Sequence, residues 1–484
     1  MSSNKVLNGL FWRFLERCGA QGVTFIVSMV LARRLDETIY GTVALMTVFT
    51  TVMQVFVDSG MGNALIQKKD ADDLDFSSVF WFNMVMCAVL YIVMFFAAPL
   101  IAWFFDTPEL TDMLRVMSLI LIVSGVKNVQ QAYVSRHMLF KRFFFATLGG
   151  TLGAAVVGIV MAYNDMGCWA LIAQLLFNTT VDTIILWITV KWRPKKQFSF
   201  ARLKKLFSYG SKLLVSSLLD TLYKELTQLI IGKKYTKADL GQYNKGQEFP
   251  KVVVTNVNSS IDSVLLPTMS QAQDNPDHVK KMTRRAIKVS TYVIMPCMVA
   301  IAVCAVPLVR LTIGAQWLPC VPYLRVFCFT YAFWPIHTAN LNAIKALGRS
   351  DLFLKLEIAK KIIGLTAILS TMWISVSAMA YSLLVTSVLS QLINSSPNKK
   401  LMKYSYLDQL KDMLPQILLS LAMGAIVYCV SFLGLNDLFT LMIQAAIGVL
   451  VYVAGSKLFH LDSFDYLFNI LMGFLHKGKK EAKV

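Results

Sequence analysis

Long apolar runs dominate this chain and restrict its fold more than any other feature of the sequence. They are about twenty residues long, the length at which a helix crosses the roughly 30 Å hydrocarbon layer of a membrane. The composition agrees, because 56% of the 484 residues are hydrophobic and only 15% are charged. We therefore predict an all-α polytopic membrane protein rather than a soluble globular one.

The apolar runs form two sets of about six and a final pair, which predicts about fourteen transmembrane helices. The first set covers 10–32, 41–66, 78–104, 113–134, 145–163 and 168–190. The second set covers 209–232, 251–271, 288–312, 321–345, 356–374 and 376–394, and the pair covers 412–433 and 437–457.

A basic polar segment separates the two sets. Seven of the fifteen residues from Lys191 to Lys205 are Lys or Arg, and such clusters stay on the cytoplasmic side of a membrane. This organisation predicts an N-terminal six-helix bundle (1–190), a basic cytoplasmic hinge (191–208), a C-terminal six-helix bundle (209–395), an additional helix pair (396–457) and a basic cytoplasmic tail (458–484).

The net charge of +19 is spread over short loops instead of one soluble face. Membrane headgroups therefore explain it better than nucleic acid, and the loop charges indicate that both termini are cytoplasmic. Two basic clusters break this pattern, because the order of spans places them outside. They are the Arg33-Arg34 pair and the lysines between Lys233 and Lys251.

The eight cysteines lie mostly within apolar runs, and the five histidines are scattered. Neither set has the spacing of a zinc site, and no phosphate-binding loop with its Ser or Thr is present in the sequence. We therefore expect no metal, no cofactor and no catalytic residues, with H⁺ or Na⁺ as the coupling ion of a secondary transporter. The extramembrane loops are also too short to hold a transferase domain, so we expect no enzyme.

An internal repeat relates the two sets of spans. Residues 30–41 align without a gap with residues 230–241, and both the basic pairs and the closing glycines, Gly41 and Gly241, coincide. Because each set holds an even number of spans, both halves enter from the same side, and a pseudo-two-fold axis along the membrane normal relates them. Such a repeat places a substrate between the halves.

Polar side chains within the predicted spans concentrate on the first two helices of each set. Ionisable groups inside a membrane are costly and generally face a wet cavity. The predicted substrate-binding side chains, for an anionic cargo such as a phosphate or pyrophosphate, are Arg13, Arg17, Thr24, Lys224, Gln228 and Asn258. The predicted coupling-ion side chains are Glu16, Asp58, Asp220, Glu225 and Asp262. Arginine suits an anionic cargo because its guanidinium binds phosphate with two parallel hydrogen bonds, whereas carboxylates suit a proton or a sodium ion.

Simpler interpretations of these charges stay open. Arg13, Glu16 and Arg17 lie in the first turns of their helix, as a snorkelling interfacial cluster would. Asp220 and Lys224 are spaced as a neutral pair that locks a helix. A second polar group fits anchors at headgroup level, and it comprises Lys127, Asn128, Gln131, His337, Asn340 and Lys345.

Several motifs are similar to those of Wzx-type flippases, the polysaccharide transporters of the multidrug/oligosaccharidyl-lipid/polysaccharide (MOP) exporter superfamily. They include Gly9-Leu-Phe-Trp, Leu31-Ala-Arg-Arg-Leu-Asp, Asp58-Ser-Gly-Met-Gly-Asn, Leu240-Gly-Gln-Tyr-Asn, Leu265-Leu-Pro-Thr-Met-Ser and Ala346-Leu-Gly-Arg-Ser-Asp. The resemblance covers nearly the whole chain and is closest to the capsular and colanic-acid type. These motifs are structural turns and helix ends, so they identify the family without fixing a coupling residue.

The resemblance implies two six-helix bundles around a cavity and a final helix pair. It further implies a secondary transporter that moves undecaprenyl-pyrophosphate-linked oligosaccharide across the bacterial inner membrane by alternating access, for capsule, exopolysaccharide or O-antigen export. The expected partners are this lipid-linked oligosaccharide, membrane lipids, and the polymerase and chain-length proteins of the pathway, with the chain itself a monomer. The alternatives are a MATE-like multidrug or cation antiporter, a membrane polysaccharide polymerase, and a scaffold of an export complex.

Overall fold

The computed structural model describes residues 3–58, 61–68, 70–137, 139–469 and 472. The side chains of residues 3–18 lie outside the described part. Within the described ranges, the regular structure consists of α-helices and short 3-10 helices, as predicted. The chain forms two compact units, Met1–Gly241 and Gln242–Val484.

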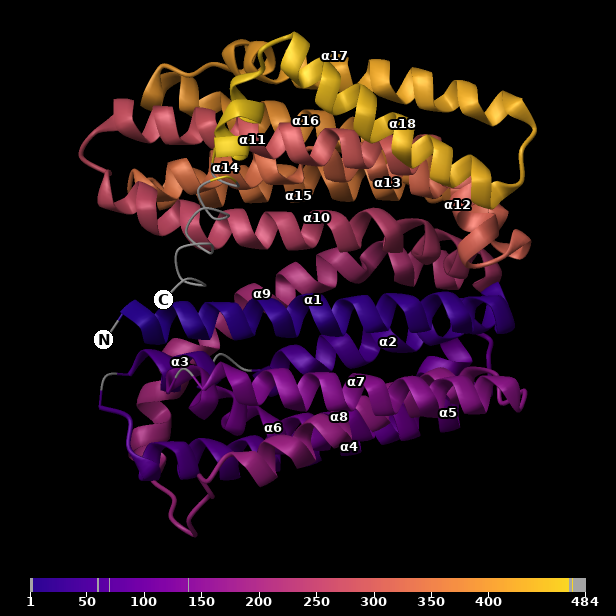
Figure 1. Cartoon of the computed structure of the whole chain (residues 1–484). Helices are drawn as coiled ribbons and strands as arrows, with labels where there is room; N and C mark the ends of the chain where they lie inside the picture. The colour runs from indigo at the N-terminus through magenta and orange to yellow at the C-terminus, as the bar shows by residue number, and fades with distance from the viewer. Residues whose placement is uncertain (1–2, 59–60, 69, 138, 470–471, 473–484) are drawn as a thin grey trace, which may run out of the picture. The chain divides into compact units, whose positions relative to one another are not determined.

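The first unit contains nine α-helices in its described part and the first turn of a tenth (Figure 1). They are α1 (Ser3–Arg34), α2 (Glu37–Asp58), α3 (Met61–Gln67), α4 (Asp73–Phe104), α5 (Leu110–Met117), α6 (Leu119–Arg136), α7 (Phe140–Tyr163), α8 (Cys168–Thr189) and α9 (Phe200–Lys234). Helix α7 packs along α1 and α8, α6 packs against α4 and α8, and α2 packs against α6 and α9.

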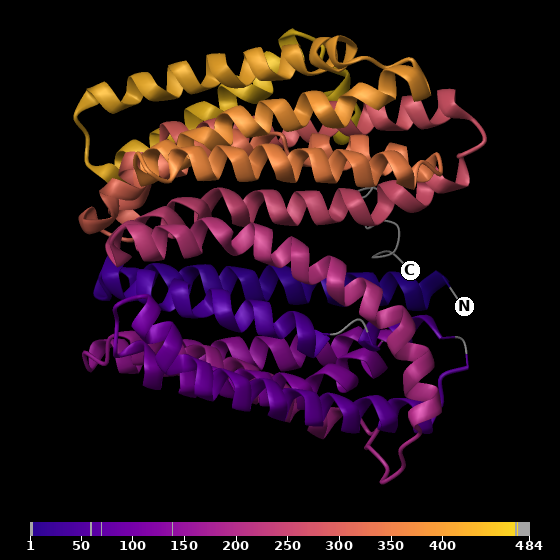
Figure 2. The ribbon, with the colours of Figure 1, turned by 180° about the vertical axis from the view of Figure 1, so that it is seen from behind.

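The second unit begins within α10 and continues to the C-terminal end of the chain. Its elements are α10 (Lys237–Gln271), α11 (Pro276–Val303), α12 (Ala305–Thr312), η1 (Ala315–Cys320), α13 (Val321–Ala332), α14 (Trp334–Ala346), α15 (Ser350–Thr371), α16 (Val376–Met402), α17 (Tyr406–Cys429), η2 (Val430–Leu433) and α18 (Asp437–Leu458). Helix α17 packs along α11 and α18, and α16 packs against α14 and α15 (Figure 2).

Capping side chains set the starts of several helices. At α4 the Asp72 carboxylate accepts the Asp75 N–H while the Asp75 carboxylate accepts the Asp72 N–H, which forms a capping box. Ser405 and Asp408 form the same box at α17. These short polar segments stop one helix and start the next because they satisfy backbone N–H groups that the helix leaves free.

Eight helices in the described part are long and apolar enough to cross a membrane. Helix α4 is the most apolar of them, yet only 17% of its apolar window is buried within the protein. Phe96, Leu100 and Trp103 are accordingly exposed on its surface. An apolar helix that the protein leaves uncovered needs an apolar solvent, so the chain is a multi-pass membrane protein. The total of about fourteen spans stays a prediction.

Four predicted spans are each divided into two α-helices, and among them the 41–66 span consists of α2 and α3 and the 288–312 span consists of α11 and α12. The 113–134 span consists of α5 and α6, which separate at Ser118, and the 321–345 span consists of α13 and α14, which separate at Phe333. Pro335 lies in the first turn of α14, where the missing proline N–H costs nothing and the fixed φ favours a new helix start. The residues around Ser118 contain no proline, so the sequence gives no comparable signal there.

The basic segment predicted as a hinge packs against the first unit. Helix α9 begins at Phe200, so the second half of the predicted hinge, 200–208, is already helical. The buried Trp192 side chain lies 5.7 Å from the Phe76 ring and 6.2 Å from the Tyr133 ring. The indole N–H of Trp81 also donates to the Lys195 carbonyl at 2.9 Å. This segment is therefore docked on α4 and α6 and is not a free linker.

Candidate functional site

The predicted site residues on α1 share one continuous helix. The side chains of Arg13, Glu16 and Arg17 lie outside the described part, and Thr24 is exposed. Because α1 is helical throughout, steps of three and four residues place Arg13, Arg17 and Thr24 along one stripe of its surface. The assignment of this stripe to a substrate stays a prediction.

The predicted residues on α9 contact one another. The Lys224 ammonium lies 2.6 Å from the Asp220 carboxylate, and the Gln228 amide donates to the Glu225 carboxylate at 2.6 Å. The Asp220 and Lys224 pair is the neutral pair that the simpler interpretation expected. Its side chains are nevertheless 41% and 67% exposed, so both remain accessible to a ligand.

Asp58, at the end of α2, is held by side-chain amides. The Asn128 amide of α6 donates to one Asp58 carboxylate oxygen at 3.1 Å, and Gln54 donates to the same oxygen at 3.3 Å. Asn128 also donates to the Val57 carbonyl at 3.3 Å. A neutral amide therefore connects α6 to the acidic end of α2.

Asp262 has the same arrangement in the second unit. The buried Asn342 amide of α14 donates to the Asp262 carboxylate at 2.8 Å. Asn258, predicted to bind substrate, lies one helical turn before Asp262, and its side-chain oxygen is buried without a hydrogen bond among the described residues. In both halves a neutral amide thus supports an exposed carboxylate, which can take up a proton without losing an ion pair with its direct partner.

A partly buried ion pair lies beside Asp58 and was missed by the sequence reading. The Lys127 ammonium of α6 is 3.0 Å from the Asp182 carboxylate of α8, and these side chains are 18% and 13% exposed. Lys127 was noticed in the sequence only as an anchor residue. Asp182 is a lone acidic residue inside the predicted span 168–190, and that alone was a signal for a buried partner.

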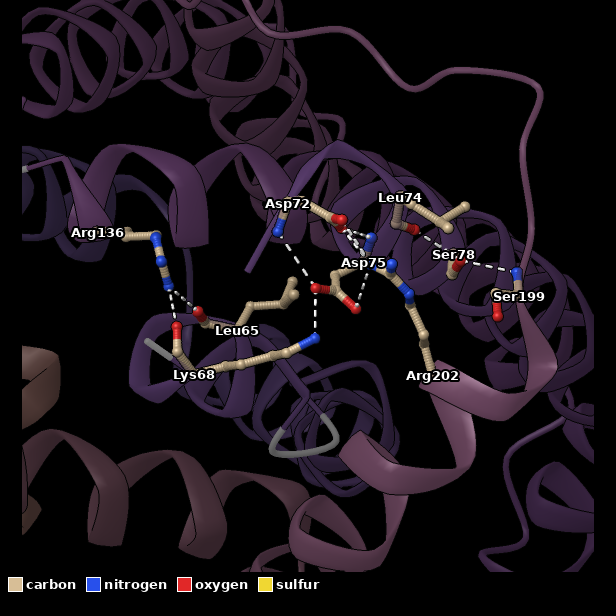
Figure 3. Close-up of polar contacts among 9 residues, drawn as sticks. All are labelled: Leu65, Lys68, Asp72, Leu74, Asp75, Ser78, Arg136, Ser199 and Arg202. Atoms are coloured by element: carbon tan, nitrogen blue, oxygen red, sulfur yellow. Dashed lines mark hydrogen bonds and ion pairs between the residues drawn. The ribbon is translucent and has the colours of Figure 1, made fainter. Parts of the chain in front are cut away.

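A cluster of charged groups, here named the α4 clamp, ties the basic segment to the start of α4 (Figure 3). One guanidinium nitrogen of Arg202 contacts both Asp72 oxygens at 2.6 and 2.5 Å. The fully buried Asp75 carboxylate lies 2.5 Å from the Lys68 ammonium and 3.7 Å from Arg202. The hydrogen bond from Arg202 lowers the pKa of Asp72 from its usual 3.8 to about 2.

Backbone groups complete the α4 clamp. The Arg136 guanidinium of α6 donates to the Leu65 carbonyl at 2.8 Å and to the Lys68 carbonyl, so it satisfies the end of α3 (Figure 3). The Ser199 N–H donates to the Ser78 hydroxyl at 2.9 Å. Helices α3, α4, α6 and α9 are therefore joined by polar contacts at one end of the first unit.

At the other end of the first unit, acidic residues in turns pair with cations of both basic clusters that broke the loop-charge pattern. Arg34, at the end of α1, is 2.7 Å from the Asp165 carboxylate in the α7–α8 turn. Lys233, in the aligned basic pair at the end of α9, is 2.9 Å from the Asp106 carboxylate in the α4–α5 turn. Acidic turn residues thus compensate one cation of each of the two aligned basic pairs.

The repeated glycines mark a close helix crossing within the first unit. A methyl group on Gly41 would overlap the Lys237 carbonyl, and one on Gly241 would overlap the Glu37 carbonyl. Glu37 and Lys237 are themselves equivalent in the predicted repeat. The first turns of α2 and α10 therefore meet symmetrically, and only glycine allows this approach.

Comparison with known proteins identifies the family. A family described as polysaccharide biosynthesis proteins matches residues 30–322. The chain belongs to this family. The chain is also 23% identical to the teichuronic acid biosynthesis protein TuaB of Bacillus subtilis, over 84% of this chain and 85% of the relative. It is 23% identical to the succinoglycan biosynthesis transport protein ExoT of Rhizobium meliloti, over 72% and 71% of the two chains.

A third relative and two solved structures agree with this assignment. The chain is 22% identical to the lipopolysaccharide biosynthesis protein WzxC of Escherichia coli, over 75% of this chain and 74% of the relative. Its fold matches the lipid II flippase MurJ with a TM-score of 0.71, 17% identity, and coverage of 95% and 99%. It matches an inward-facing MATE transporter with a TM-score of 0.62, 15% identity, and coverage of 80% and 96%. The fold is therefore that of the MOP superfamily, as the sequence motifs implied.

Proposed function

We propose that this protein is a flippase that moves a diphosphate-linked lipid oligosaccharide across the bacterial cytoplasmic membrane by alternating access. The observation that carries the proposal is the family match over residues 30–322. The names of its relatives, for teichuronic acid, succinoglycan and lipopolysaccharide, and the fold shared with the flippase MurJ support a lipid-linked glycan as cargo. The protein is a transporter and not an enzyme.

The proposal extends to its place in the cell. Both termini are cytoplasmic, and the protein acts as a monomer beside the polymerase and chain-length proteins of its pathway. Support comes from the loop charges, since the α4 clamp gathers Lys68, Arg136 and Arg202 at one end of the first unit. At the other end, acidic residues pair with two of the outlying cations, Arg34 and Lys233.

The substrate diphosphate binds to Arg13 and Arg17 in this account, with Lys224 as a further cation. Thr24, Gln228 and Asn258 contact the sugars. The exposed Lys224 side chain supports this role, because it can exchange its pairing with Asp220 for a phosphate.

Asp58 and Asp262 are our first choice for coupling to H⁺ or Na⁺. Each carboxylate is exposed and is held by an asparagine amide of a helix in its own half. A neutral donor supports the charged and the protonated carboxylate, so these residues can change protonation during a transport cycle. Glu16, Asp220 and Glu225 remain further candidates.

A multidrug or cation antiporter is the second candidate function, and the match to the MATE fold favours it. The two functions predict different effects on cells that lack the protein. Loss of an antiporter sensitises cells to drugs, whereas loss of a flippase leaves lipid-linked oligosaccharide on the inner leaflet.

Depletion of the protein in its own host tests the function. Carrier lipids are extracted and analysed by mass spectrometry after treatment of intact cells with a membrane-impermeant glycosidase. The expected result is accumulation of a full repeat unit on carrier lipid that the glycosidase cannot reach. Accumulation of glycosidase-accessible units would point to a polymerase, and unchanged lipids with new drug sensitivity would point to the antiporter.

The variants Arg17→Ala and Arg17→Lys test the proposed diphosphate contact. Both should reach the membrane at normal levels, because alanine and lysine have a helix propensity at least similar to that of arginine at this position within α1. Export should fall strongly in Arg17→Ala and partly in Arg17→Lys, since lysine keeps the charge and loses the planar fork. Full export by Arg17→Ala would remove Arg17 from the site.

A further inference from the structure

A cavity of about 580 Å³ lies in the second unit, and none of the residues proposed to bind substrate is among those that line it. Residues of α11, α17 and the turn after α18 line it. This is the end of the unit where α16 finishes with Lys399 and Lys400 and α17 begins. In the proposed topology that end faces the cytoplasm.

The acidic groups of the cavity are already neutralised. Asp412, whose side chain is 6% exposed, accepts two hydrogen bonds from Arg284 at 2.6 and 2.7 Å. It accepts a third from the Tyr404 hydroxyl at 2.9 Å. Asp462 is compensated by Lys288, whose ammonium lies 3.0 Å away. Together, the two ion pairs carry no net charge.

One cation that lines the cavity does not belong to either of these ion pairs. Lys411 is exposed and forms no ion pair within 4 Å among the described residues. Asp408, one turn earlier, accepts hydrogen bonds from the Ser405 hydroxyl and N–H at 2.6 and 3.0 Å. His460, also exposed at the rim, adds an imidazole that can donate a hydrogen bond. The cavity thus offers one cation that has no ion-pair partner within 4 Å, although the Asp408 carboxylate attracts it from one turn away, and it offers a neighbouring donor.

The remaining wall is apolar and open. Leu418 is 56% exposed and Phe459 is 67% exposed, and Ala422 lies exposed one turn beyond Leu418. Apolar side chains beside a cation at the end of membrane helices match a lipid, whose charged head meets the basic group while its chains cover the wall. A soluble anion would leave the apolar wall without a contact, and an apolar compound would leave the lysine without an ion pair.

We propose that this cavity binds the phosphate of a glycerophospholipid with one net negative charge. Lys411 and His460 contact the phosphate, and Leu418, Ala422 and Phe459 contact the acyl chains. The charge decides between membrane lipids, because one lysine without an ion-pair partner balances one phosphodiester and leaves the additional charge of a diphosphate unbalanced in the cavity.

Lipid binding to the purified full-length protein tests this site. The protein is delipidated in detergent, and phosphatidylglycerol or phosphatidylcholine is titrated while bound lipids are counted by native mass spectrometry. The affinity for phosphatidylglycerol should fall at least fivefold in Lys411→Ala. It should also fall in Ala422→Trp, which fills the apolar side without changing charge. Lys400→Ala, which removes an exposed lysine from α16, should change it less than twofold.

Equal loss in Lys400→Ala and Lys411→Ala would show a general attraction to the basic surface and overturn the proposal. Tighter binding of undecaprenyl diphosphate than of phosphatidylglycerol at Lys411 would also overturn it. If Ala422→Trp does not fold, Lys411→Glu serves as the second variant and should abolish the phosphatidylglycerol preference. The readout involves no transport, so its outcome is independent of the flippase proposal.

Discussion

Lys127 and Asp182 form an ion pair in which the loss of one partner should cost stability. Their side chains are mostly buried and face each other at 3.0 Å. Removing one partner of a buried pair leaves an uncompensated charge, which typically costs about 3–5 kcal/mol, whereas replacing both by apolar residues is often tolerated.

We predict that Asp182→Asn lowers the thermal unfolding temperature of the purified protein and its level in the membrane. The double variant Lys127→Met with Asp182→Leu should recover most of both. Thermal unfolding in detergent measures the effect. A double variant as unstable as Asp182→Asn would show that the pair does more than neutralise itself.

The contact of Asp72 with Arg202 carries a prediction about pH. The folded-state pKa of Asp72 is lowered from 3.8 to about 2, chiefly by the hydrogen bond from Arg202. A lowered pKa stabilises the folded contact above the unfolded value and loses this effect as pH falls through the folded one. The α4 clamp should therefore hold unchanged from pH 8 to pH 5 and weaken only between about 3.8 and 2. Hydrogen–deuterium exchange of residues 191–203, corrected for intrinsic rates, measures it.

Asp72→Asn is the matched variant for this contact. It should expose residues 191–203 to exchange already at pH 7 and remove the acid-dependent step. Protection that is equal in the variant and the wild type would assign the docking of the segment to Trp192 and the neighbouring rings alone.

At the scale of helices, the crossing of α2 and α10 limits what the repeat can tolerate. Gly41→Ala and Gly241→Ala each place a methyl group against a backbone carbonyl, which cannot move aside as a side chain would. Both should reduce export strongly. Gly22→Ala on α1 is the control, because nothing lies within 4 Å of its added methyl, and it should leave export unchanged. Normal export by both crossing variants would mean that this contact is not needed in the cycle.

The sequence predicted the helices better than their ends and contacts. Apolar runs predicted nearly every long helix, since burial in lipid requires about twenty apolar residues whatever the neighbours are. The division at Ser118 had no local signal, because α5 and α6 separate without a proline or glycine at that point. The docking of the basic segment was also not predicted, because its many lysines indicate a solvated loop although Trp192 within it is buried.

Partners of the charged residues could not be predicted for a different reason. Lys233 and Asp106 are 127 residues apart, and only the folded chain brings them together. The Asp220 and Lys224 pair was predictable because one helical turn separates the two residues. Sequence spacing therefore predicts contacts within a helix, and the contacts between helices that support Asp58 and Asp262 needed the structure.

For the whole molecule, the topology is the first consequence to check. Single cysteines at Met166, in the α7–α8 turn, and at exposed Gln197 should react from opposite sides of the membrane. In a cysteine-free background, a membrane-impermeant maleimide added to intact spheroplasts should label the Met166→Cys variant and leave Gln197→Cys unlabelled until lysis. Labelling of both from outside would contradict the assigned orientation.

The flippase activity itself is the central claim, and reconstitution tests it most directly. Purified protein is placed in proteoliposomes with the lipid-linked oligosaccharide of its host, and an external glycosidase reports the accessible fraction over time. Our account predicts that nearly all of the glycan becomes accessible with active protein, and only the outer-leaflet fraction with protein-free vesicles or with Arg17→Ala. An outer-leaflet fraction that stays unchanged in the presence of folded wild-type protein, under an imposed H⁺ or Na⁺ gradient, would contradict it.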